Sequence, residues 1–116
     1  MKGKPSSYFS ATPEGKLFKG KINGKFPITA IVTKIYEDSS LKMQYWYDDQ
    51  KVPIELDGDF KDNRFTLVEI DHHSEELDKW ITKANIRADW INNKKIMGTW
   101  TNYQTKEVLK FELERY

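Results

Sequence analysis

The chain contains no cysteine. Disulfides, thiol nucleophiles and thiolate metal ligands are therefore excluded together, and the absence suits either the cytoplasm or the periplasm. An excess of one charge is also missing, because 19 basic and 18 acidic residues are interspersed and leave a net charge of +1. Since no basic stripe is available to follow a phosphate backbone, we expect no nucleic-acid partner.

Long apolar runs are absent as well. No stretch approaches the roughly 20 residues that a membrane-spanning helix needs, so we expect no transmembrane segment. The beginning, MKGKPSSYFSATPEG, carries Lys, Ser and Pro but not the apolar core of a signal peptide. Such a beginning fits a cytoplasmic chain, and it also fits the spacer that follows a removed export signal. We favour an extracytoplasmic protein, periplasmic or lipid-anchored, and keep a cytoplasmic location as the alternative.

Recognisable catalytic motifs are missing too. No nucleophile stands beside a base in a known pattern, and no glycine-rich phosphate loop occurs. We therefore expect a non-enzymatic protein with no catalytic residues and no cofactor.

What the sequence does contain is aromatic residues and short alternating segments. Aromatic residues make up 14% of the 116 residues, which supplies the apolar area for the core of one domain. Apolar and polar residues alternate in segments that recur roughly every 10 to 14 residues, separated by turn formers such as Asn23-Gly24. The pattern predicts an all-β fold, a single antiparallel up-and-down β-barrel of about eight strands over residues 17–116. A flexible N-terminal arm, 1–16, is expected before it, and at most one short helical turn near 74–79.

Several short elements repeat along these segments, namely YWY, IELDGDF, FTLVEI, IMGTW and FELERY. In this respect the chain resembles small bacterial extracytoplasmic proteins of unassigned function, which share Tyr-x-Tyr, Ile-x-Leu-x-Gly, Leu-x-Glu and Gly-x-Trp elements. More broadly, the meander resembles the calycin-type barrels, the avidin-like and lipocalin-like groups. The resemblance implies a barrel and no particular ligand, because the lipocalin Gly-x-Trp lies on the first strand, whereas Gly98-Thr99-Trp100 falls on the seventh.

Both histidines of the chain lie in the stretch EIDHHSEELDKW, residues 69–80. Neighbouring residues of a strand point to opposite faces, so His72 and His73 cannot both face one site. A zinc site would need at least three convergent ligands, and no suitable spacing is present. We predict a polar loop here that binds no metal.

Glu69 continues the alternation of Phe65 and Leu67, which directs its side chain towards the barrel interior or its rim. Two interpretations are open. The carboxylate either lies in solvent at the strand end or under a lysine, or it is a polar anchor in a pocket with aromatic walls. In the second case aromatic donors would approach it across the lumen. The candidate ligand-binding residues are Glu69, Tyr45, Tyr47 and Trp100.

Trp46 has the opposite phase from Tyr45 and is expected outside the barrel. Other apolar residues share outward phases with it, namely Ile31, Ile35, Val68, Ile70 and Met97. These are either scattered exposed residues or parts of a patch that contacts another protein. The candidate interface residues are Trp46, Ile31, Val68 and Met97.

Two functional hypotheses follow. The first is a protein-binding module of inhibitor or immunity type that uses outer strand faces and loops and has a protein partner. The alternative is a barrel that binds a small molecule in an aromatic pocket around Glu69. The number of large residues on inward phases favours the first, because a barrel filled with side chains leaves little room for a guest.

Overall fold

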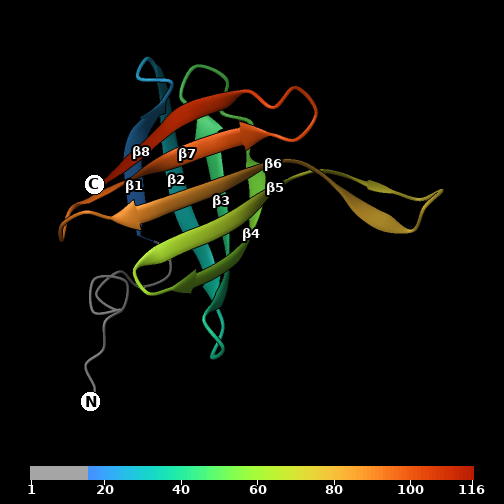
Figure 1. The fold of residues 1–116 in the computed structure, drawn as a ribbon, viewed down its shortest axis with the longest axis horizontal. Coiled ribbons are helices and arrows are strands. Elements are labelled where there is room, and N and C mark those ends of the chain that lie inside the picture. The colour runs from blue at the N-terminus through green and yellow to red at the C-terminus, as the bar shows by residue number, and fades with distance from the viewer. Residues whose placement is uncertain (1–15) are drawn as a thin grey trace.

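The computed structural model describes residues 16–116, which form an antiparallel barrel closed by eight strands in chain order (Figure 1). The last strand pairs with the first and so closes the sheet. This confirms the predicted all-β, eight-stranded up-and-down barrel; the predicted arm, apart from Lys16, lies outside the described residues. The strands are β1 (Leu17–Ile22), β2 (Phe26–Ile35), β3 (Ser40–Tyr47), β4 (Ile54–Lys61), β5 (Arg64–Ser74), β6 (Lys79–Trp90), β7 (Lys95–Asn102) and β8 (Val108–Arg115).

Tight turns join the strands where the sequence places Asn, Asp and Gly. Asn23 and Gly24 have φ angles of 60° and 69°, and Asp62 and Asn63 have 54° and 64°. Positive φ at both central residues is the conformation of a type I′ turn, whose twist matches that of the flanking strands. These turns therefore set the register of the β1–β2 and β4–β5 hairpins.

The interior is packed with side chains from all eight strands. The buried apolar residues alternate along each strand, as the pleat requires. An apolar space of about 10 Å³ remains between Met43, Phe65, Ile86 and Phe111, roughly the volume of one water molecule. The prediction that side chains fill the lumen thus agrees with the packing of the core.

Gly98 shows how closely the strands approach one another at inward positions. A Cβ atom at this residue would lie 1.9 Å from the carbonyl oxygen of Arg87 on β6. No side chain fits there, so glycine is required by the backbone contact between β6 and β7.

One inward–outward assignment is wrong because of a β-bulge. The register of β2 against β3 shifts between Val32 and Lys34, so Thr33 is an extra residue. Ile35, predicted to point outwards, consequently pairs with Leu41 and packs against the core.

The stretch around the histidines is also not a loop, which corrects a second prediction. β5 continues to Ser74 and β6 starts at Lys79, so that His72 pairs with Ile81 and His73 with Trp80. Residues 75–78 form a turn rather than a helical segment, with the Leu77 N–H donating to Ser74 Oγ at 3.2 Å. Within residues 16–116 no helix has the length and apolar character required to cross a membrane.

Candidate functional site

Glu69 is a buried carboxylate inside the barrel. It pairs with Leu56 of β4 and Ala84 of β6, and only 4% of its surface is exposed. The Tyr45 hydroxyl donates to Glu69 Oε1 at 2.5 Å, and the Trp100 indole N–H donates to the same oxygen at 2.9 Å. The interpretation that placed this carboxylate in solvent or under a lysine is therefore wrong. Side chains from β3, β5 and β7 meet at one atom.

Tyr45 is held in its donor form by this environment. Burial, followed by the charge of Glu69, raises the pKa of the Tyr45 hydroxyl far above its ordinary value of 10.0. Burial also raises the pKa of Tyr47, which is half-buried and packs edge-on against Tyr45 with ring centroids 5.9 Å apart. The structure thus brings together all four predicted ligand-site residues, with Tyr47 on the outer side of the cluster. We call Glu69, Tyr45, Tyr47 and Trp100 the Glu69 cluster.

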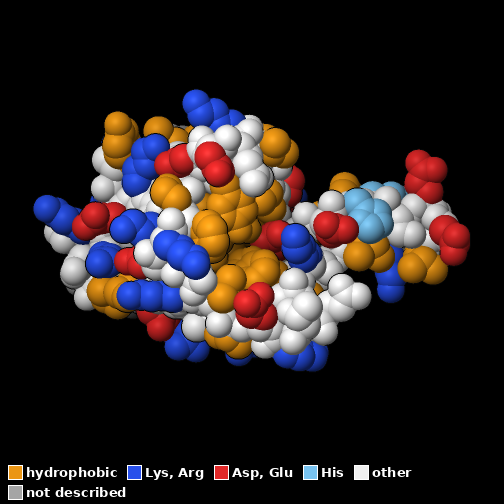
Figure 2. All heavy atoms as spheres, turned by 90° about the horizontal axis from the view of Figure 1, so that it is seen from above, with side chains coloured by type: hydrophobic (Ala, Val, Ile, Leu, Met, Phe, Trp, Pro, Cys, Tyr) orange, Lys and Arg blue, Asp and Glu red, His pale blue; other side chains and the backbone are white. Residues whose placement is uncertain are grey.

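The Glu69 cluster lies near the barrel end that carries the turns at 23–25, 48–53 and 103–107. Figure 2 looks onto this end, and hydrophobic side chains gather at the centre of the face. Exposed apolar residues at this end include Phe26, Val52, Tyr103 and Val108, while Ile54 and Leu109 pack against the core beneath them. The buried carboxylate therefore lies under an apolar rim.

Beyond Glu69, strands β5 and β6 leave the barrel as a two-stranded ribbon. We call residues 70–83 the projecting hairpin; it runs along the longest axis of the molecule, which measures 46 Å (Figure 1). The ladder shifts on either side of Ile70, with Lys83 as the extra residue on β6 and Asp71 on β5. Bulges bend and twist a hairpin, and one on each strand turns this one away from the barrel wall.

The projecting hairpin displays large apolar side chains in an acidic setting. Trp80 is 63% exposed and Leu77 is 59% exposed, and the Trp80 ring meets the His73 ring edge-on at 4.9 Å. Figure 2 shows acidic side chains at the tip of this projection. Its exposed carboxylates outnumber its lysines and leave a net charge of −2; they are Asp71, Glu75, Glu76 and Asp78, against Lys79 and Lys83.

The two histidines have separate acidic neighbours. His72 Nδ1 lies 2.7 Å from Asp71 Oδ2, and His73 Nε2 lies 3.8 Å from Asp78 Oδ1. In the described part of the chain, no group of three or more histidine or carboxylate side chains is placed to hold a metal ion. Each histidine is thus arranged as a paired surface residue.

The four predicted interface residues do not form one patch. Trp46 and Ile31 are diagonal neighbours on β3 and β2, whereas Val68 lies between Asp57 and Asn85, and Met97 between Asp89 and Glu112. All four are only partly exposed. They are therefore separate apolar residues on three parts of the wall.

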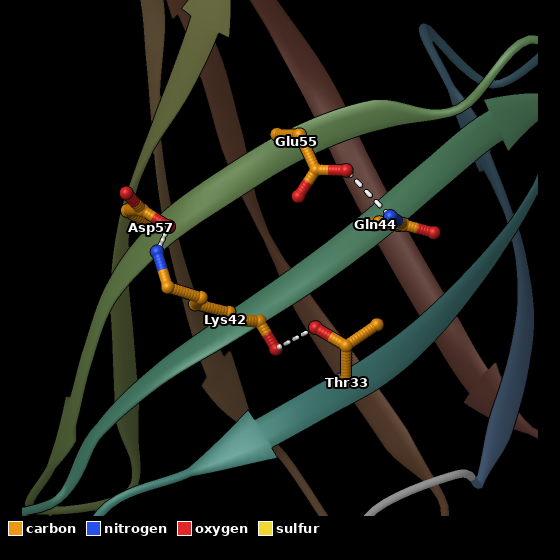
Figure 3. Close-up of polar contacts among 5 residues, drawn as sticks. All are labelled: Thr33, Lys42, Gln44, Glu55 and Asp57. Atoms are coloured by element: carbon orange, nitrogen blue, oxygen red, sulfur yellow. Dashed lines mark hydrogen bonds and ion pairs between the residues drawn. The ribbon is translucent and has the colours of Figure 1, made fainter. Parts of the chain in front are cut away.

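Polar pairs lie on the outside of the wall formed by β2, β3 and β4 (Figure 3), where Gln44 is the strand partner of Ile31. Lys42 Nζ donates to Asp57 Oδ1 at 2.9 Å, and Gln44 Nε2 donates to Glu55 Oε2 at 2.5 Å. Thr33 Oγ1, at the β2 bulge, donates to the carbonyl oxygen of Lys42 at 3.1 Å. These pairs leave no continuous apolar face on the outside of β2, β3 and β4.

The projecting hairpin was missed by sequence reasoning. The signal that could have indicated it is Leu77 and Trp80, two large apolar residues within an otherwise charged stretch. Comparisons of the chain with protein-family models, with curated proteins and with solved structures gave no match.

Proposed function

We propose that this protein is a non-enzymatic binding module of inhibitor or immunity type, and that it inserts the projecting hairpin into a recess of a protein partner. The observation that carries the proposal is Trp80, 63% exposed on a ribbon that stands away from the barrel. Trp is the residue most enriched among the anchors that dominate the energy of protein interfaces. An aromatic ring at such a position has little to contribute to the core.

The energy available from this side chain is considerable. Covering the exposed apolar part of a Trp removes on the order of 100 Å² from water, which corresponds to about 2.5 kcal/mol. Leu77, 59% exposed in the turn at 75–78, adds a second apolar contact on the same hairpin. Strand pairing holds Trp80, and the hydrogen bond from the Leu77 N–H to Ser74 Oγ orders the turn, which lowers the entropy lost in the complex.

The charge of the projecting hairpin indicates the kind of partner surface that would fit it. A net charge of −2 around Trp80 and Leu77 fits an apolar recess with a positively charged rim. Complementary charge of this kind raises the rate of association, and the rate then falls as salt is added.

The packed lumen supports this proposal over a ligand enclosed in the barrel. The apolar space inside measures about 10 Å³, whereas pockets for small molecules measure roughly 300 to 1,000 Å³. The outer wall carries polar pairs beside Trp46, so we assign the contact to the hairpin rather than to that wall.

A site-specific cross-linking experiment tests the proposal. A photo-cross-linking amino acid replaces Leu77 in one variant and Tyr116, 80% exposed after the end of β8, in another. We expect a distinct protein from the native host to be captured from position 77 and not from position 116. The same capture should disappear when Trp80→Ala is added. Equal capture from both positions, or capture at 77 that survives Trp80→Ala, would contradict the proposal.

A further inference from the structure

The two oxygens of the Glu69 carboxylate have different surroundings. Both hydrogen bonds, from Tyr45 and from Trp100, go to Oε1. Among the described residues none donates a hydrogen bond to Oε2, although Glu69 is 4% exposed. Oε2 is not one of the fully buried polar atoms that lack a partner, so this oxygen keeps some solvent contact. A carboxylate has about four lone-pair sites, and Oε2 is therefore an acceptor that a donor from outside the described residues can reach.

No positively charged side chain among the described residues pairs with Glu69 Oε2. The ion pairs formed within residues 16–116 involve other carboxylates, and no Lys or Arg pairs with Glu69. Instead, two aromatic side chains contact the carboxylate through the Tyr45 hydroxyl and the Trp100 indole N–H, and Tyr47 packs edge-on against Tyr45. Tyr and Trp rings attract cations over their faces. A negative charge among aromatic rings is the arrangement that recognises an organic cation.

The position of the Glu69 cluster limits how large a ligand can be and from which end of the barrel it can approach. The deeper interior is closed, since the space between Met43 and Phe111 measures about 10 Å³. Tyr47, half-buried, lies on the side of the cluster towards the apolar rim seen in Figure 2. A small charged head group can meet Oε2 from this end while its alkyl chain stays against the rim.

We propose that the Glu69 cluster binds an alkylammonium ion, with the ammonium N–H groups donating to Glu69 Oε2 and the alkyl chain lying on the apolar barrel end. The site is separate from the projecting hairpin and does not depend on a protein partner. A primary ammonium fits because it supplies both the positive charge and the N–H donors that Oε2 lacks.

A titration with n-butylammonium chloride tests the site. The Trp100 indole N–H donates to the same carboxylate, so its nuclear magnetic resonance signal reports binding directly. We expect a saturable shift of this signal with n-butylammonium and none with n-butanol or with sodium chloride at equal concentration. This comparison uses the unaltered protein and does not depend on the folding of a variant.

Two matched variants locate the ligand. Glu69→Gln keeps an oxygen that accepts from Tyr45 and Trp100 and replaces Oε2 with an amide donor. Glu55→Gln removes an exposed carboxylate from β4 and is the control. We expect affinity for n-butylammonium to fall at least about tenfold in the first variant and to stay unchanged in the second. No saturable shift in the unaltered protein, an equal shift with n-butanol, or equal affinity of Glu69→Gln would overturn the proposal.

Discussion

Tyr45 and Glu69 are 24 residues apart in the sequence, and a 2.5 Å hydrogen bond joins them across the interior of the barrel. Trp100, a further 31 residues along the chain from Glu69, donates to the same oxygen. Burial of a carboxylate is costly unless donors replace its water, and these two side chains supply that replacement at Oε1. Three strands are consequently held to one another through a single polar atom.

Removing the Tyr45 donor should therefore weaken the fold. We expect Tyr45→Phe to lower the free energy of unfolding by about 1 to 3 kcal/mol, because it leaves the buried carboxylate with one donor fewer. Tyr116→Phe is the control, since it removes the same hydroxyl from a tyrosine that is 80% exposed and donates no hydrogen bond to Glu69. Urea unfolding of the two variants measures the difference. Equal losses would show that the hydrogen bond itself contributes nothing.

Alkaline pH should destabilise the protein through the same tyrosine. The pKa of Tyr45 is raised in the folded state above its ordinary value of 10.0, so the unfolded chain releases this proton first. Stability is then fully present below about pH 10 and falls as the pH rises above it. Urea unfolding from about pH 8 to about pH 11 should show this fall, and Tyr45→Phe should reduce its slope. An unchanged slope in that variant, with exposed Tyr116→Phe as the control, would refute the assignment.

The tryptophans should separate into core and surface residues. Trp90 is 6% exposed within the aromatic core, so Trp90→Ala should cost about 3 to 5 kcal/mol. Trp80→Ala should change the free energy of unfolding by no more than about 0.5 kcal/mol, since the ring lies on the projecting hairpin. Thermal or urea unfolding distinguishes them. A loss at Trp80 as large as that at Trp90 would mean that the hairpin packs on the barrel.

We expect that the two histidines bind no metal ion that stabilises the fold. His72 and His73 each pair with one carboxylate, at 2.7 Å and 3.8 Å, and share no third ligand. We expect the melting temperature to stay the same when zinc or a chelator is added. A zinc-dependent rise of several degrees that disappears in the double alanine variant would contradict this expectation.

The barrel could be predicted from the sequence because its determinants are local. Alternation places Glu69 on the inward face with Phe65 and Leu67, and the Asn23-Gly24 turn fixes a hairpin. The sequence alone does not predict that Tyr45 and Trp100 donate to the same oxygen of Glu69. This contact depends on the register of strands that are distant in the sequence.

The errors arose where a single extra residue changes the register. Thr33 reverses the phase of Ile35, and Lys83 and Asp71 turn the projecting hairpin away from the wall. A bulge has no necessary composition, so alternation alone does not reveal it. The continuation of β5 to Ser74 likewise depends on pairing with β6 and not on the polar residues of the stretch themselves.

Calorimetry at one salt concentration should compare the affinity of the captured partner for the unaltered protein, for Trp80→Ala and for Trp46→Ala. We expect Trp80→Ala to weaken binding by about thirtyfold or more, equivalent to about 2 kcal/mol, and Trp46→Ala to change it by less than about threefold. Full affinity in Trp80→Ala together with loss in Trp46→Ala would contradict this expectation and move the interface from the projecting hairpin to the barrel wall.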